Sequence, residues 1–172
     1  RLKSLIESQG KTCKILKYPA YDLEPTGPRI TLATKKGNPE GLTSEDLQVL
    51  NSQNKHDFEP ILIGHLQSYD FVIAEMYKGT SVAFGMGEGL SQDFLESMET
   101  DLYTEDVSIL LDGERFMEAK EEGHRFEEDG EKMDRIRQIH LLLAQERNWS
   151  VVNANQPEEK VTEDIWAIIS AS

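Results

Sequence analysis

Short, nearly continuous apolar runs recur along this chain and alternate with segments of helical spacing. Strands that are apolar on both faces must be covered on both faces, and such strands pair in parallel when helices connect them. We therefore predict an α/β fold in which helices cover both faces of a parallel sheet. The predicted strands are 12–19, 70–75, 107–113 and 150–154.

Helical signals fill most of the chain between these runs. Thr43, with Asp46 three residues later, predicts a capped helix over 44–67, in which Pro60 should cause a kink or start a second segment. The segment 20–30 is predicted to be a loop because it contains two prolines and a glycine. The other predicted helices are 1–9, 90–98, 114–121, 131–146 and 157–170.

The last of these helices has its own pattern. Pro157 suits the first helical position, because a residue there needs no hydrogen-bonded N–H. Its predicted buried side consists of Val161, Ile165, Ile168 and Ile169.

Charge and cysteine content exclude some classes of function. The 18 basic residues are scattered among 32 acidic ones, which argues against a nucleic-acid surface, because such surfaces cluster Lys and Arg. No apolar run approaches the roughly 20 residues that a membrane helix needs. The single cysteine, Cys13, is typical of a reducing compartment, so we expect a cytoplasmic protein. The length of 172 residues suits one domain over 1–172, with no membrane or nucleic-acid partner.

Polar side chains stand where predicted strands end. Glu75 closes one run and Tyr77 follows it, Asp112 lies at the end of another, and a loop begins at Pro19. Ligands of parallel sheets bind outside the carboxyl ends of the strands. We expect these residues to gather at one edge of the sheet.

Three stretches together resemble a known enzyme family. They are LNSQNKHDFEPIL (50–62), FVIAEMYKGTSVAFGMGEGLSQDFLE (71–96), and 123–166, which holds a charged loop, a helix and a Trp-containing strand. Their order and spacing resemble the thymidylate kinases, which are P-loop nucleoside monophosphate kinases. The resemblance implies a three-layer P-loop kinase fold that transfers the ATP γ-phosphoryl group to dTMP with Mg²⁺, in a homodimer. Phe58, Ile61 and Phe94 are candidates for the dimer contact, although burial in the core explains them as well.

The phosphate-binding loop of that family, GxxxxGK[ST], does not occur in this sequence. The nearest match, QGKTC (9–13), leads from a helix into a strand, whereas a P-loop leads from a strand into a helix. We expect the family's first strand and P-loop to precede Arg1 in the natural protein. Without that central strand, two halves of a sheet would each expose an edge, and the chain would be inactive.

The resemblance also assigns roles to residues. Glu75 takes the position of a catalytic acid near the metal, where its carboxylate would hold a water of Mg²⁺. Arg125 takes that of the lid arginine, in a lid over about 121–131, and would stabilise charge on the transferred group. Residues implied to bind the acceptor nucleotide are Pro19, Tyr21, Asn51, Lys55, Tyr77, Ser81, Phe84 and Phe126, and those implied to bind ATP are Arg125, Ala154 and Asn155.

Plain alternatives exist for several of these residues. Glu75 would otherwise pair with a basic side chain, Lys55 would lie on a solvated helix face, and Phe84 would belong to the core. Three positions also depart from the family. Asn51 replaces a Phe that stacks on thymine, Met76 replaces an Arg, and Lys55 replaces an Arg whose bidentate fork it lacks. These departures keep two alternatives open: a kinase for another nucleotide or a deoxynucleoside, and a non-catalytic nucleotide-binding relative.

Overall fold

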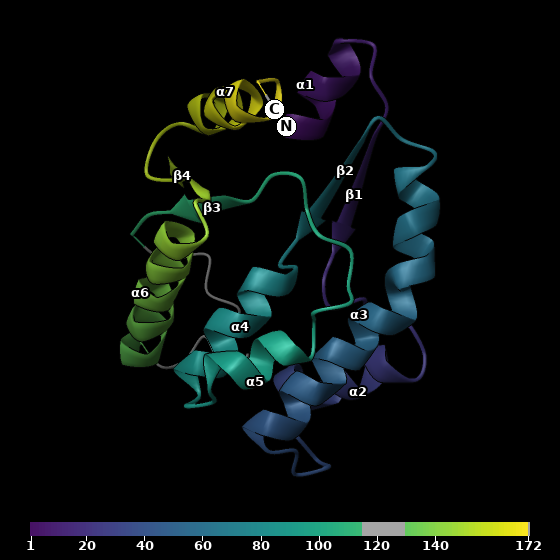
Figure 1. The fold of residues 1–172 in the computed structure, drawn as a ribbon, viewed down its shortest axis with the longest axis vertical. Helices are drawn as coiled ribbons and strands as arrows, with labels where there is room; N and C mark the ends of the chain where they lie inside the picture. Colours follow the sequence, from purple (N-terminus) through teal and green to yellow (C-terminus); the bar gives the residue numbers. More distant parts are fainter. Residues whose placement is uncertain (115–129, 172) are drawn as a thin grey trace.

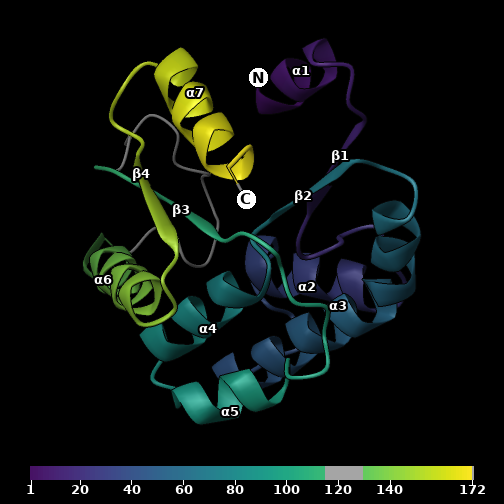
Figure 2. The ribbon, with the colours of Figure 1, turned by 45° about the horizontal axis from the view of Figure 1, so that its top comes forward.

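The fold alternates strands and helices and is described by a computed structural model over residues 1–114 and 130–171. Helices α1 and α7 lie on one side of the strands, and the other helices lie on the opposite side and around the edge (Figures 1 and 2). No helix within these ranges is long and apolar enough to cross a membrane. The elements are α1 (Leu2–Ser8), β1 (Cys13–Lys17), α2 (Thr26–Lys35), α3 (Ser44–Leu66), β2 (Phe71–Glu75), α4 (Lys78–Gly87), α5 (Gln92–Ser97), β3 (Ile109–Asp112), α6 (Gly130–Glu146), β4 (Ser150–Asn153) and α7 (Glu158–Ile169).

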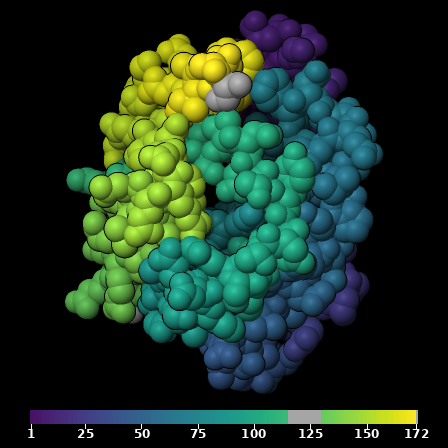
Figure 3. Space-filling model, in the orientation of Figure 1, coloured from purple at the N-terminus to yellow at the C-terminus, as the bar shows by residue number. Residues whose placement is uncertain are grey.

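The strands form two parallel pairs. In the first, β1 pairs with β2, and Lys17 lies opposite Glu75 at the carboxyl ends. In the second, β3 pairs with β4, and Asp112 lies opposite Asn153. Within the described ranges no ladder joins the two pairs. In the space-filling view a hollow opens between the yellow-green C-terminal part of the chain and its teal middle part (Figure 3). The arrangement matches the two sheet halves that the sequence predicts.

Helix α7 packs less deeply than its sequence predicts. None of its residues is fully buried, so the predicted buried side of Val161, Ile165, Ile168 and Ile169 is wrong: each is only partly covered. The helix lies beside α1, where Arg1 forms ion pairs with Glu158 and Glu159. Its apolar face lies over strand pairs that do not meet, so no continuous sheet covers it.

Helix α2 contradicts the predicted loop over 20–30, because it begins at Thr26. Pro28 falls in the first turn, where a missing N–H leaves no helical hydrogen bond unmade. Gly27 is required there, since a Cβ would lie 2.2 Å from the carbonyl oxygen of Tyr21. The buried Ile30 and Ala33 then pack on α3.

Helix α3 begins as predicted. The Thr43 side chain accepts a hydrogen bond from the Asp46 N–H, and Asp46 accepts one from Thr43. Pro60 lies inside the helix, which continues to Leu66, so of the two predicted outcomes the second segment does not form. The helix axis changes direction along its course, which agrees with the predicted kink (Figure 1).

The segment between β3 and α6 is described only at its ends. Glu114 is not helical, and the rest of the predicted helix 114–121 lies outside the described residues. Helix α6 begins at Gly130, which the sequence places in the lid, one residue before the predicted helix start at Glu131. Arg125 and Phe126 lie outside the described residues.

Helix α4 occupies the centre of the largest buried cluster. Its Val82 and Ala83 pack with Leu95, Ile136 and Leu143. The close approach depends on its glycines, because a Cβ would lie 2.4 Å from Leu95 at Gly85 and 2.4 Å from Ile136 at Gly87. Gly79 lies against the Trp149 ring and so connects the first strand pair to the second.

We predict that Gly79→Ala destabilises the protein by about 1–3 kcal/mol, since the new methyl group would overlap an indole ring held in the core. A Cβ at this position would lie 2.2 Å from Trp149 Cη2. The matched control is Gly64→Ala in α3, where a Cβ meets nothing within 4 Å. That change should stabilise the helix by about 0.5–1 kcal/mol. Urea unfolding of both variants measures the effects, and equal shifts would contradict the packing described here.

Candidate acceptor site

A cavity of about 180 Å³ lies beyond the carboxyl end of β1, with walls from α2, α3 and α4. It brings together most of the predicted acceptor residues. Those that line it are Pro19, Tyr21, Asn51, Lys55, Ser81 and Phe84. Phe84 also packs against two buried clusters, so it serves the core and the cavity together.

One face of α3 forms the polar wall of this cavity. Gln48, Asn51 and Lys55 follow one another at helical spacing and all line it. Gln48 is 3% exposed, and its Oε1 has no hydrogen-bond partner among the described residues. Leaving a buried carbonyl unpaired destabilises a fold. The presence of the unpaired Gln48 carbonyl beside a cavity indicates a surface that can bind a polar ligand.

A second buried amide on α3 fixes the loop that borders the cavity. Asn54 Oδ1 accepts a hydrogen bond of 2.7 Å from the Ala20 N–H. Its Nδ2 donates to the Ala20 carbonyl at 3.1 Å and to Thr26 Oγ1 at 2.8 Å. Asn54 thereby holds the loop between β1 and α2, which carries Pro19 and Tyr21, in place.

Lys55 is buried rather than solvated. Only 2% of its side chain is exposed, and its Nζ donates to Ser81 Oγ and to Glu99 Oε1. Burial lowers the pKa of Lys55, and the Glu99 carboxylate opposes that shift. Burial likewise raises the pKa of Glu99, and Lys55 opposes it. The alternative of a solvated helix face is therefore wrong for Lys55.

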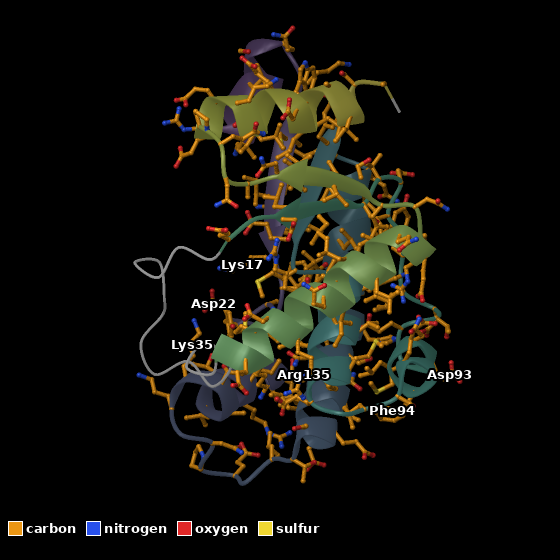
Figure 4. All side chains as sticks on the ribbon, turned by 90° about the vertical axis from the view of Figure 1, so that its left-hand side faces the viewer. Lys17, Asp22, Lys35, Asp93, Phe94 and Arg135 are labelled. Atoms are coloured by element: carbon orange, nitrogen blue, oxygen red, sulfur yellow. The ribbon has the colours of Figure 1, made fainter. Side chains whose placement is uncertain are left out.

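Two further lysines line the same cavity. Lys17 ends β1 and Lys35 ends α2, and Figure 4 shows them on the same side of the molecule. The Lys35 ammonium lies 4.9 Å from the centre of the Tyr21 ring. Clustered ammonium groups are suited to an anionic ligand such as a phosphate.

The carboxyl end of β2 carries the predicted metal ligand. Glu75 is exposed there, and Met76, which follows it, is 46% exposed and lines the cavity. Met76 has φ 60°, a left-handed conformation that non-glycine residues seldom adopt. Such strain is typical of functional sites.

Tyr77 does not line the cavity, in contrast to the prediction. Its hydroxyl donates a hydrogen bond of 3.1 Å to the Tyr103 carbonyl, and its ring centre lies 4.9 Å from that of Tyr18. Burial raises the pKa of Tyr77, and nearby carboxylates add to that shift. Tyr77 packs against the buried cluster of Leu16, Tyr18 and Leu62.

The residues expected beside ATP belong to the second strand pair. Asn155 follows β4 and accepts a hydrogen bond from the Glu114 N–H just after β3. The Ala154 N–H donates to the Asp112 carbonyl at 2.7 Å. The Asp112 carboxylate lies 2.6 Å from Arg137 Nε, and that hydrogen bond lowers its pKa. None of these residues lines the cavity, so the residues expected beside ATP lie apart from those expected beside the acceptor nucleotide.

Several residues of the site are not assigned by the sequence, among them Gln48, Asn54 and Glu99 and the cavity lysines Lys17 and Lys35. Asn54 lies inside the stretch 50–62 that resembles the family, between Asn51 and Lys55, so its position in the sequence could have marked it as a site residue. Gln48 shares the helical face of Asn51. No sequence signal marks Glu99, because its partner Lys55 is 44 residues away.

Comparison with known proteins finds relatives that are named as thymidylate kinases. A protein of Invertebrate iridescent virus 6 that bears a thymidylate kinase name is 25% identical over 130 residues, 74% of this chain and 61% of that protein. A "Probable thymidylate kinase" of Pyrobaculum calidifontis is 28% identical over 120 residues, 67% of this chain and 60% of its own length. The chain thus spans less than two thirds of the length of these curated relatives.

The fold agrees with these relatives. A solved structure of thymidylate kinase from Candida albicans superposes with a TM-score of 0.81, at 19% identity, over 99% of this chain and 84% of that one. This match shows the α/β fold of a P-loop kinase. The family model described as thymidylate kinase matches residues 2–165, and the chain therefore belongs to the thymidylate kinase family.

Proposed function

We propose that the protein is a thymidylate kinase, which transfers the γ-phosphoryl group of ATP to dTMP, and that the chain forms one nucleoside monophosphate kinase domain. The observation that carries this proposal is the cavity beyond β1, where α3 supplies Asn51 and Lys55 and α4 supplies Ser81 and Phe84. The relatives bear the same activity in their names. The two alternatives, another acceptor and a non-catalytic relative, have no such support.

The cavity lining matches the parts of a nucleoside monophosphate. Phe84 and Tyr21 offer aromatic surface to a base, and Asn51 offers both a donor and an acceptor. Lys17 and Lys35 offer positive charge to the monophosphate. Holding the acceptor in one orientation is the main task of an enzyme that transfers phosphoryl groups.

ATP and Mg²⁺ would be bound beside this cavity. When bound, Mg²⁺ neutralises charge on the phosphates. Glu75 fits a role in holding it, because it places an exposed carboxylate at the carboxyl end of β2, and Mg²⁺ prefers one or two carboxylates together with substrate oxygens. Ala154 and Asn155 are proposed to lie beside the adenine, and Arg125 and Phe126 to reach the reactants from the lid.

The remaining features are proposed from the family. The protein would act as a homodimer in the cytoplasm. Of the candidate contact residues, Ile61 is 43% exposed and available to a partner. Phe58 packs on Tyr18, and Phe94 packs in the α4 cluster, on the other side of Figure 4 from Lys17.

We predict that the full-length protein phosphorylates dTMP with ATP and Mg²⁺ and leaves thymidine unchanged. The lysines that line the cavity would hold the acceptor phosphate, which thymidine lacks. Coupled measurement of ADP release over a panel of nucleoside monophosphates and nucleosides checks this. Turnover on another acceptor alone would favour the first alternative. ATP binding without turnover on any acceptor would favour the non-catalytic reading.

A second prediction concerns Met76, which replaces the family's arginine. Met76→Arg should raise kcat/KM for dTMP by about tenfold, because a guanidinium at the cavity rim would form charge-assisted hydrogen bonds with the acceptor phosphate. Leu142→Arg is the matched control: Leu142 is 47% exposed on α6 and does not line the cavity. A gain of equal size in both variants would mean that general charge steering, and not position 76, is responsible.

A further inference from the structure

Glu99 lies behind the polar wall of the acceptor cavity and has no role in the proposals above. It follows α5, is 4% exposed, and accepts a hydrogen bond from Lys55 Nζ through Oε1. Its second oxygen, Oε2, is buried and has no hydrogen-bond partner among the described residues. A buried carboxylate satisfied on one side only is costly for a fold.

The segment that carries Glu99 is fixed to α3 along its whole length. Ser52 Oγ donates to the Met98 carbonyl at 2.8 Å, and His56 Nε2 lies 3.0 Å from Asp101 Oδ1. The Tyr103 N–H donates to Glu59 Oε1 at 2.6 Å. These α3 residues recur at helical spacing on either side of Lys55. The carboxylate of Glu99 therefore has a fixed place relative to Lys55.

Stability alone does not account for the pair. Removing two charges from water costs more than their attraction usually returns, and apolar residues of similar size are often as stable or more stable. The Lys55 and Glu99 side chains are only 2% and 5% exposed. A pair this deeply buried, one member of which lines a ligand cavity, indicates a role in binding.

We propose that Glu99 is a positioning residue, which together with Ser81 holds the Lys55 ammonium so that its third N–H serves a carbonyl oxygen of the acceptor base. This rests on the proposed function. An ammonium has three donors. Ser81 and Glu99 accept hydrogen bonds from two of these N–H groups. The third N–H is available to a ligand in the cavity that Lys55 lines.

The first test compares dTMP binding by three forms of the full-length protein in calorimetry. Glu99→Gln should weaken dTMP binding by about 10- to 100-fold, because it removes the charge that holds Lys55. Asp101→Asn is the matched control: it removes the same charge two residues further along, from an exposed carboxylate, and the new amide oxygen can still accept a hydrogen bond from His56 Nε2. It should bind dTMP as the unsubstituted protein does. Equal affinity in Glu99→Gln and Asp101→Asn would overturn the proposal.

The pH profile separates positioning from a merely structural role. The ammonium donates below the pKa of Lys55 and is lost as pH rises through it. Three groups face Lys55: Glu99 favours its charge, Lys78 of α4 disfavours it, and Ser81 accepts from it. Loss of the carboxylate lowers the pKa of Lys55 further, so dTMP affinity in Glu99→Gln should fall at a lower pH than in the unsubstituted protein. An unshifted profile would contradict the proposal.

A double variant keeps the test open if Glu99→Gln does not fold. Lys55→Met with Glu99→Leu leaves no unpaired charge, so it should fold at least as stably as the unsubstituted protein. It should bind dTMP as weakly as Lys55→Met alone, because Glu99 acts only through Lys55. Additive losses would show that Glu99 contacts the nucleotide independently, contrary to the proposal.

A separate measurement distinguishes failure of the proposed function from failure of the positioning role. If the unsubstituted protein binds no dTMP, the acceptor assignment falls. The Lys55 Nζ protons in ¹⁵N-lysine spectra of the ligand-free protein still report the positioning. These protons should be protected from exchange with water in the unsubstituted protein and in Asp101→Asn. In Glu99→Gln this protection should be lost. Protection that persists in Glu99→Gln would overturn the positioning role.

Discussion

The need to pair buried polar groups along α3 organises most of this structure. The helix carries Gln48, Ser52, Asn54 and Lys55 at buried positions, where each polar atom needs a partner. Asn54 binds the loop before α2 and Thr26 at the start of that helix. Ser52 donates to the segment after α5, and Lys55 donates to that segment and to Ser81 of α4. The helix thus fixes both neighbours, and the cavity lies where their walls meet. Among the described atoms of α3, Gln48 Oε1 and Glu59 Oε2 are buried without a hydrogen-bond partner, and of these two residues Gln48 stands in the cavity wall.

Local signals predicted the local elements. The pair Thr43 and Asp46 marks the start of α3, because a cap is made by residues three positions apart. The apolar run 70–75 became β2. Helix α2 was missed because Pro25, Gly27 and Pro28 read as turn residues. The packing of Ile30 and Ala33 on Leu47 and Leu50 outweighed that tendency, and packing between elements is not visible in a short window.

The sequence predicted most of the residues that line the cavity, because they lie on strands, helices and loops whose order matches the family. Pro19, Tyr21, Asn51, Lys55, Ser81 and Phe84 meet in one cavity as the resemblance implied. The state of Lys55 was not predictable, since burial and pairing depend on Glu99, 44 residues away. The face of α7 was misjudged for a similar reason. The apolar spacing of α7 correctly predicts a helix. The strand pairs beneath the helix do not join, and the spacing of residues in one helix does not show what that helix packs against.

The compact ammonium of Lys55 also limits how this position can change over generations. A guanidinium is planar and carries five donors, whereas the ammonium of Lys55 has one hydroxyl and one carboxylate oxygen as its described acceptors. A change to arginine at position 55 would meet the Glu99 side chain before it gained a new contact with a nucleotide. An arginine at position 55 therefore requires a new arrangement of the Ser81 and Glu99 side chains around it.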